Sequence, residues 1–237
     1  MNWQIDDIEK AINRAERQIA PVADVIANDL NISKKDDLFI VGGFVRDNML
    51  AGLTSKGNVS KDLDLMLQQR PSFENNSNIL WWRKNSLGGI KLGTKSFPEI
   101  DIFQQNVSNP QLLVGEIFDF NCNALYYSHL KKQIFPSVYF YGFLSNKTID
   151  FENYIINKHG IETRYSPYSM VSRALKFQIQ FKEKYAIDAK LSSNILYVLN
   201  NLDKDMEQKM FDYTKRKAKS EILKDEIISE YKRLRYK

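Results

Sequence analysis

The segment LFIVGGFVRDNML, residues 38–50, and the segment KDLDLML, residues 61–67, decide the fold of this chain. The first segment predicts a short buried strand that runs into a pair of glycines and then into a helix. The second alternates apolar and acidic residues, which is typical of a half-buried strand with Asp62 and Asp64 on one face. A strand, a glycine turn, a helix and a second strand predict a head of the α+β class.

Further strands are expected in GGIKL (88–92), EIDIF (99–103), IFDFNCNALYY (117–127), SVYFYGFL (137–144) and KTIDF (147–151). The aromatic run in SVYFYGFL is expected to lie in the core of the sheet. Residues 2–30 have helical spacing, and Pro21 is expected to start a second helix. Helical spacing returns after residue 166. These patterns predict a head domain with N-terminal helices over residues 1–151 and a small helical domain over residues 152–237.

The composition is that of an ordinary globular chain, with 43% hydrophobic residues among 237. Cys122 is the lone cysteine, which excludes an internal disulfide and a four-cysteine zinc site and suits a reducing compartment. The N-terminus lacks the apolar core of a signal peptide, and the longest apolar stretch, Leu38–Val45, is too short to span a bilayer. We therefore expect a soluble, cytoplasmic protein without a membrane partner; the sequence leaves the oligomeric state open.

Positive charge is concentrated at the C-terminus. The formal net charge is +5, and the stretch Met206–Lys237 holds ten Lys or Arg against six Asp or Glu. A basic region of this kind favours polyanions such as RNA, DNA or nucleoside triphosphates. The alternative is a solvated helix face of mixed charge, and the sequence leaves both interpretations open.

Carboxylates on neighbouring strands indicate a cation site. Asp62 and Asp64, two residues apart on one strand, repel each other unless a cation lies between them, and their oxygens suit Mg²⁺, with Mn²⁺ as a possible substitute. Asp101 in EIDIF is expected to be the third ligand of a two-metal site. Glu99 shares the strand face of Asp101, but it follows Pro98 at the expected start of the strand. Asp101 is therefore favoured over Glu99.

The glycine pair suggests a second element of chemistry. Gly42 and Gly43 end a strand and open a helix, so the backbone N–H groups there can approach a phosphate closely. Arg46, one turn into the helix, has a planar guanidinium that suits a triphosphate oxygen, and Asp47 can hold Arg46 or the helix start. The alternative is a simple strand-to-helix turn with a surface salt bridge.

The segment LFIVGGFVRDNML followed by KDLDLML resembles the head domain of class II CCA-adding enzymes and bacterial poly(A) polymerases. These enzymes are nucleotidyltransferases of the DNA polymerase β type. The resemblance continues at DFNCNALYY and SRALKF and covers roughly residues 38–180. It implies that a nucleoside triphosphate is the substrate, that Asp62 and Asp64 bind the metals, and that Asp119 and Asn123 lie near the sugar. It further implies that Gly42, Gly43 and Arg46 hold the triphosphate and that Arg173 lies on the helix that reads the base.

The chain also departs from that family's pattern. Ile117 and Phe118 stand where the family has two arginines, and Pro167 and Met170 stand where it has the Asp and Arg that read the base edges. Neither Pro167 nor Met170 can form those hydrogen bonds. The chain is also much shorter than a CCA-adding enzyme. These departures argue against ordered CCA synthesis.

Three hypotheses about function follow from these residues. The first is metal-dependent transfer of a nucleotide to an RNA end. The second is a small transferase that modifies a protein or a small molecule, and the third is an inactive relative that binds a nucleotide or a partner. Retention of three mutually repelling aspartates argues against the third. The basic C-terminus favours a nucleic-acid acceptor, but likeness of fold alone does not choose one.

Overall fold

The computed structural model describes residues 3–56, 62–69, 73, 76–84, 89–104, 106–111, 119–151, 155–157, 160–162 and 166–236. The chain divides into two compact units. The first comprises Met1–Phe118 and Asn123–Tyr141, and the second comprises Asp119–Cys122 and Gly142–Lys237. The division expected from the sequence, between residues 151 and 152, stays a prediction.

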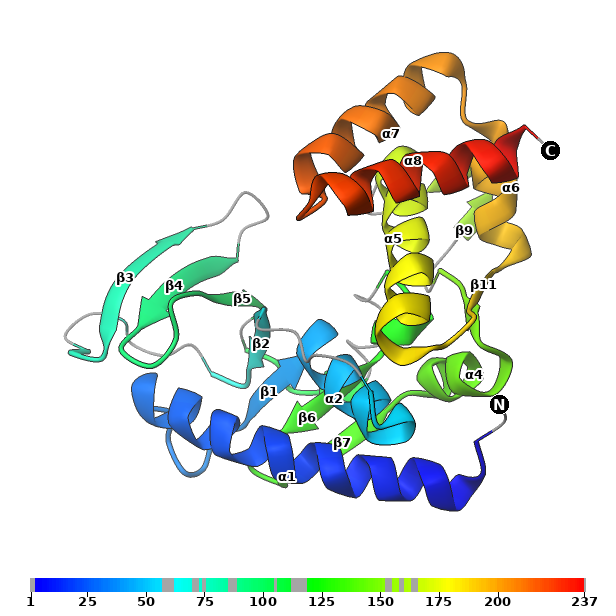
Figure 1. Cartoon of the computed structure of the whole chain (residues 1–237). Coiled ribbons are helices and arrows are strands. Elements are labelled where there is room, and N and C mark those ends of the chain that lie inside the picture. Colours follow the sequence, from blue (N-terminus) through cyan, green and yellow to red (C-terminus); the bar gives the residue numbers. More distant parts are fainter. Residues whose placement is uncertain are drawn as a thin grey trace. The chain divides into compact units, whose positions relative to one another are not determined.

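A mixed sheet dominates the first unit, and it has seven strands within the described residues (Figure 1). Its strands are β1 (Leu38–Val41), β2 (Leu63–Leu67), β3 (Ile79–Lys84), β4 (Ile90–Thr94), β5 (Ile100–Gln104), β6 (Leu125–Ser128) and β7 (Gln133–Pro136). Their order is β3-β4-β5-β2-β1-β6-β7. The strands β2 and β5 run parallel, and the other neighbouring pairs are antiparallel. The α+β class expected from the sequence is confirmed.

The helices α1 (Ile5–Asp29) and α2 (Gly43–Thr54) pack against each other and against this sheet. Leu65, Ile100 and Ile102 are fully buried, as expected for the apolar positions of half-buried strands. The alternation in KDLDLML and EIDIF therefore predicts correctly that the leucine and isoleucine positions are buried and that the carboxylates remain accessible. It does not predict Met66, which lies on the strand face of Asp64 and is fully buried.

The helix α1 corrects the expectation at Pro21. The helix runs without a break from Ile5 to Asp29, with Pro21 in its interior. An interior proline costs about 3 kcal/mol because it removes one backbone hydrogen bond and crowds the preceding turn. Buried side chains continue on both sides of it, from Ala15 and Ile19 to Ala23. We infer that this continuous apolar stripe, packed on the sheet and on α2, offsets the cost.

The aromatic segment 137–144 is a helix and not the strand that its composition suggests. The helix α4 (Val138–Asn146) buries Phe140 and Phe143, three residues apart, and leaves Tyr139 and Tyr141 exposed. This period is helical, and the Ser137 hydroxyl accepts a hydrogen bond from the Phe140 N–H at 3.2 Å. High β-propensity reflects packing on a pleated surface, so it fails as a guide where the segment packs as a helix. The expected place in the sheet core is therefore wrong.

The strand expected over 117–127 is also shorter than its alternation suggests. The strand β6 begins at Leu125, and a short 3₁₀ helix, η1 (Asn121–Asn123), precedes it. Asp119, Asn121 and Asn123 are all buried, so the polar positions do not form a solvent face. Ile117 and Phe118, which mark a departure from the family's pattern, lie outside the described residues.

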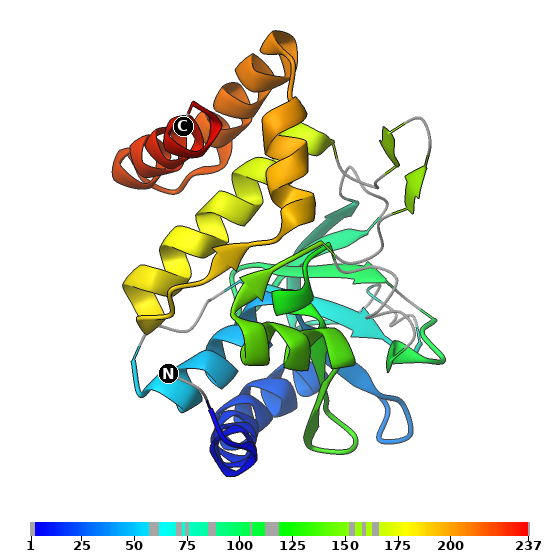
Figure 2. The same ribbon diagram turned by 90° about the vertical axis from the view of Figure 1, so that its right-hand side faces the viewer.

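The second unit is mainly helical, as expected. Its helices after residue 166 are α5 (Pro167–Tyr185), α6 (Ser193–Asn201), α7 (Lys204–Lys217) and α8 (Glu221–Arg235). Two small sheets join β8 (Thr148–Ile149) to β11 (Lys190–Leu191) and β9 (Ile155–Asn157) to β10 (Gly160–Glu162). The helix α5 starts with Ser166 and Pro167 in the predicted cap and first positions. Figure 2 shows α5 in yellow and the helices that follow it.

None of the helices in the described ranges combines the length and the apolar run that crossing a bilayer requires.

Candidate functional site

Two carboxylates lie side by side on the central strands of the first unit. In the parallel pairing of β2 with β5, Asp64 and Asp101 are Cα partners. Paired residues on adjacent strands point to the same face of a sheet, and both side chains are partly exposed while their neighbours in sequence are buried. The structure thus brings together two of the three aspartates that the sequence singles out.

Asp62 and Glu99 occupy the ends of these two strands. Asp62 precedes β2 by one residue and is exposed, on the same strand face as Asp64. Glu99 precedes β5, and its Oε1 lies 2.6 Å from Nζ of Lys91. Asp101, rather than Glu99, therefore has the cross-strand position beside Asp64.

Lys91 is a residue of the site that sequence reasoning missed. It is the Cα partner of Asp101 on β4, and its Nζ lies 3.6 Å from Asp101 Oδ2. The hydrogen bond to Glu99 raises the pKa of the Lys91 ammonium, and the charges of Asp101 and Glu99 add to the effect. A fixed positive charge therefore partly neutralises the carboxylates. The lysine stands in the expected strand GGIKL, but only the strand register places it beside Asp101.

The donor chemistry of the pair fits a hard divalent cation. Carboxylate oxygens are the donors that Mg²⁺ prefers, and Asp64 and Asp101 present them from adjacent positions of two strands. In the described part of the chain, no group of three His, Cys, Asp or Glu side chains is arranged to hold a metal ion. The pair therefore fits such an ion in donor type and position, while Asp62 as a further ligand stays a prediction.

The glycine turn lies directly beside Asp64, because Val41 is the Cα partner of Asp64. Gly42 follows with φ 66° and ψ −134°, a positive-φ conformation that strains residues with a side chain. The helix α2 begins at Gly43 without a side-chain cap, and its first intrahelical bond joins the Arg46 N–H to the Gly42 carbonyl at 3.0 Å. The backbone donors of this helical N-terminus therefore lie one strand away from the carboxylate pair and suit an anion.

Arg46 is buried in the protein and is not extended into solvent. Its Nε lies 2.8 Å from Asp47 Oδ1, and its Nη1 lies 2.5 Å from Asn123 Oδ1. Arg46 is 6% exposed and Asp47 is 2% exposed, so this ion pair is not the surface salt bridge that the sequence allows. The guanidinium holds the first turn of α2 to the segment before β6. Asp47 therefore holds Arg46, which is one of the two roles that the sequence suggests for it, the other being to hold the helix start.

The remaining candidates lie in the second unit. On α5, Arg173 forms an ion pair with Asp119, and its guanidinium carbon lies 5.5 Å from the ring centre of Phe120. Asp119 is buried and Arg173 is partly exposed. Met170, one turn before Arg173, is 2% exposed, so its side chain packs inside the unit.

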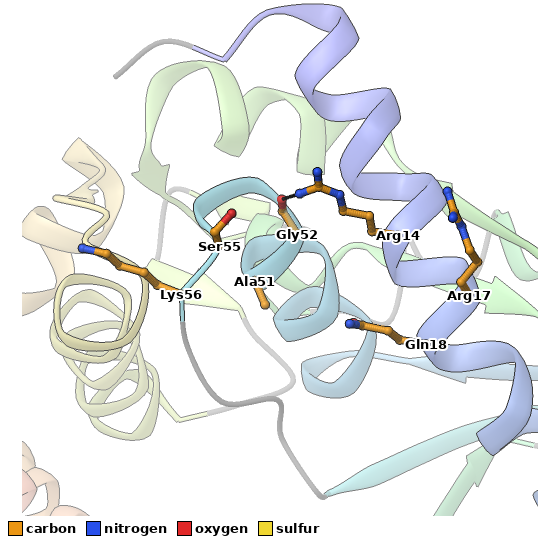
Figure 3. Close-up of a pocket in the computed structure, with 7 residues that line it drawn as sticks. All are labelled: Arg14, Arg17, Gln18, Ala51, Gly52, Ser55 and Lys56. Carbon is orange, nitrogen blue, oxygen red and sulfur yellow. Dashed lines mark hydrogen bonds between the residues drawn. The ribbon is translucent and has the colours of Figure 1, made fainter.

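A pocket of about 530 Å³ lies along α1 and α2 of the first unit (Figure 3). Arg14 Nη1 donates to the Gly52 carbonyl at 3.4 Å, and a Cβ at Gly52 would lie 3.1 Å from the Ala11 carbonyl oxygen. The glycine thus permits a close approach of the two helices. The other lining residues are Arg17, Gln18, Ala51, Ser55 and Lys56. None of the residues that the sequence predicts for the site lines this pocket.

No protein-family model matches the sequence, and no curated protein matches the chain. Solved structures of CCA-adding enzymes do match it. An apo form aligns at 15% identity with a TM-score of 0.59, covering 94% of this chain and 53% of that one. The complex of a CCA-adding enzyme with CTP gives 15% identity and a TM-score of 0.57. The Thermotoga maritima enzyme complexed with tRNA gives 15% identity and 0.56, and in both complexes the match covers 95% of this chain and 54% of the other.

This likeness confirms the resemblance in fold that the residues over 38–180 indicate. The chain spans just over half the length of the CCA-adding enzymes that it matches.

Proposed function

We propose that this chain is a metal-dependent nucleotidyltransferase that transfers a nucleoside monophosphate from a nucleoside triphosphate to an acceptor hydroxyl. The observation that carries the proposal is the cross-strand row in which Val41, Asp64 and Asp101 are successive partners. This row sets an anion-binding helix N-terminus next to a pair of carboxylates. A triphosphate with its divalent cation has the charges that both features require.

Each residue has a distinct part in this proposal. The backbone N–H groups at Gly42 and Gly43 bind the triphosphate. Arg46 keeps that turn in place through Asp47 and Asn123, which makes it a positioning residue. Asp64 and Asp101, with Asp62, hold the metal, which supplies activation of the hydroxyl and stabilisation of charge on the phosphate when it is bound.

The chemistry is a displacement at phosphorus. The acceptor oxygen forms a bond to the α-phosphorus, the bond from that phosphorus to the bridging oxygen of the β-phosphate breaks, and pyrophosphate leaves. The acceptor hydroxyl releases its proton to solvent water. In the second unit, we propose that Arg173 and Asp119 contact the nucleotide, Asp119 near its sugar, as the family resemblance implies.

The acceptor that we propose is the 3′ end of an RNA. Two matched enzymes are described with CTP and with tRNA, which supports nucleotides and RNA as partners. The basic C-terminal stretch also supports RNA, since α7 ends in Lys215, Arg216 and Lys217. Some of this charge is used locally, because Lys224 pairs with Glu221 and Arg233 pairs with Glu230. The loss of the two base-reading side chains argues against ordered CCA addition.

The test is incubation of the full chain with each labelled NTP and Mg²⁺, together with total RNA, protein lysate or small-molecule hydroxyl acceptors in separate reactions. We expect label in the RNA fraction, and Asp64→Asn as the matched control is expected to abolish it. Label in protein or small molecules instead would retain the transferase and overturn the RNA acceptor. No transfer to any acceptor would overturn the proposed function.

A further inference from the structure

The hairpin of β3 and β4 carries side chains that the proposed reaction does not use. Residues 75–98 contain four Lys or Arg and no Asp or Glu, together with two adjacent tryptophans. The strand β3 lies at one edge of the seven-stranded sheet, next to β4 (Figure 1). Trp81 and Trp82 are 39% and 44% exposed. Aromatic rings interleaved with cations on an open strand are typical of surfaces that bind single-stranded nucleic acid.

Gly93 leaves room for the Trp81 indole to lie against the sheet. Gly93 is the Cα partner of Trp81, and a Cβ at Gly93 would lie 2.3 Å from Trp81 Nε1 and 2.7 Å from Cε2. The indole therefore occupies the space that any other residue's side chain would need. Arg83 lies two residues further along β3, with its guanidinium carbon 5.7 Å from the centre of the Trp81 ring. The two side chains form a packed aromatic and cationic pair.

The strand register connects this pair to the carboxylates. Arg83 is the Cα partner of Lys91, Lys91 is the partner of Asp101, and Asp101 is the partner of Asp64. Successive partners share one face of a sheet, so the cations and the carboxylates form one transverse row. Three strand spacings separate Arg83 from Asp64, about 14 Å. A few nucleotides of single-stranded nucleic acid can span this distance.

The opposite face of β3 has a different environment. The Trp82 ring contacts the Phe73 ring in a tilted arrangement, with 5.8 Å between ring centres, and Lys84 is the partner of Ile90. The alternation of a strand therefore separates Trp81 and Arg83 from Trp82 and Lys84. Lys84 provides a control that carries the same charge as Arg83 on the same strand but faces away from the row.

We propose that Trp81, Arg83 and Lys91 form a platform that binds single-stranded RNA just before its 3′ end. Trp81 stacks on a base, and Arg83 and Lys91 contact phosphodiester groups, so that the terminal hydroxyl reaches the carboxylates. The inference rests on the proposed function, and it specifies that the RNA acceptor is single-stranded near its 3′ end. Charge favours this occupant over a second copy of the chain, because two such hairpins would bring like charges together.

The test is a direct binding measurement on the full chain, without nucleotide or metal. An unstructured uridine oligonucleotide carrying a fluorescent label is titrated with protein, and anisotropy reports its Kd. Trp81→Ala and Arg83→Ala are each expected to weaken binding about tenfold, in line with the energies of base stacking and phosphate contacts. Trp81→Phe retains most of the affinity, and Lys84→Ala stays within about twofold of the wild type. Thermal unfolding shows whether each variant is folded.

Three outcomes would overturn the platform: no binding by the wild type, equal losses in Arg83→Ala and Lys84→Ala, or a change of molar mass in light scattering on Trp81→Ala. The last outcome would identify the surface as a contact between copies. Failure of the platform is distinguishable from failure of the proposed function, because the binding assay needs no reaction. If the wild type labels RNA but does not bind the oligonucleotide, the platform is refuted and the proposed transferase function is not. If the wild type binds the oligonucleotide and the variants show the expected losses, but no acceptor is labelled, the transferase function is refuted and the platform is not.

Discussion

Arg46 donates a hydrogen bond from its Nη1 to Oδ1 of Asn123 at 2.5 Å, across 77 residues of sequence. The same guanidinium contacts Asp47, and all three side chains are buried. The first turn of α2 is thereby fixed to the segment before β6. If the turn holds a triphosphate, as we propose, it requires this kind of support, because the backbone donors have to stay in place when the ligand leaves.

Arg46→Ala is expected to lower the free energy of unfolding by about 3–5 kcal/mol, because it leaves the Asp47 carboxylate buried without its partner. Arg46→Lys keeps the charge but loses the planar fork, so its loss is smaller. Urea denaturation measures both, with exposed Arg17→Ala on α1 as the control. In variants that remain folded, NTP affinity is expected to fall more for alanine than for lysine. Unchanged NTP affinity in the alanine variant would place Arg46 outside the function of the turn.

The parts of the fold that depend on local pattern were predictable. Alternation in KDLDLML and EIDIF indicates which carboxylates stay accessible, and the glycine pair indicates the strand-to-helix turn at its observed place. The nearness of Asp101 to Asp64 was expected from the sequence, but their exact cross-strand register and the place of Lys91 beside Asp101 were not predictable. Register between strands far apart in sequence depends on tertiary packing. The same reason explains the segment 137–144, where aromatic residues with high β-propensity pack as a helix.

Asp101 rather than Glu99 is expected to bind the divalent cation. Asp101 is the cross-strand partner of Asp64, whereas Glu99 lies before the strand and pairs with Lys91. Asp101→Asn should therefore weaken Mn²⁺ binding by at least about tenfold, as the loss of one charged ligand predicts. Glu99→Gln serves as the matched control and should change it little. Electron paramagnetic resonance of added Mn²⁺ measures both, and a larger loss in the glutamine variant would show that the assignment is reversed.

Lys91→Met is expected to strengthen Mn²⁺ binding. The Lys91 ammonium lies 3.6 Å from Asp101 and competes with a metal ion for the carboxylate. A unit charge at about 4 Å in a well-solvated site contributes on the order of 1 kcal/mol, which corresponds to about fivefold in affinity. Lys84→Met, on the opposite face of the hairpin, controls for the general change in charge. Weaker binding in Lys91→Met would show that the lysine organises the carboxylates instead of competing for them.

Tyr127 is expected to make stability sensitive to alkaline pH. The side chain is fully buried, its hydroxyl has no hydrogen-bond partner among the described residues, and burial raises its pKa to about 12. The folded state holds the proton more tightly than the unfolded state, whose tyrosine titrates near its ordinary pKa of 10.0. This contribution to stability is therefore complete below pH 10 and is lost as pH rises from 10 towards 12.

Tyr127→Phe removes the titrating group and the buried hydroxyl without a partner. We expect the variant to be as stable as the wild type at pH 7, or more stable by about 1 kcal/mol, and to lose less stability above pH 10. Thermal unfolding across this pH range measures the difference. Tyr197→Phe, at an exposed tyrosine, is the control. Identical alkaline profiles for Tyr127→Phe and the wild type would contradict the assignment.

The start of α5 bears on which nucleotide the chain selects. The resemblance places the residues that read base edges at the start of α5, where this chain has Pro167 as the first helical residue and Met170 buried at 2% exposure. A site that loses its hydrogen-bonding partners loses discrimination between bases. Arg173, one turn further, pairs with Asp119 and offers only donors, so it can favour a base with an acceptor edge but cannot replace a paired donor and acceptor.

We therefore expect either relaxed base selection or preference for a single NTP, without ordered addition of CTP and then ATP. The measurement is incorporation of each NTP, alone and in mixtures, into a tRNA that lacks its terminal CCA. Arg173→Ala should flatten whatever preference the wild type shows, and Lys182→Ala, near the other end of α5, provides the control for a lost charge. Faithful synthesis of C-C-A on that substrate would contradict the alignment of α5 with the base-reading helix. It would also show that the chain is a CCA-adding enzyme, against the expectation from Pro167 and Met170.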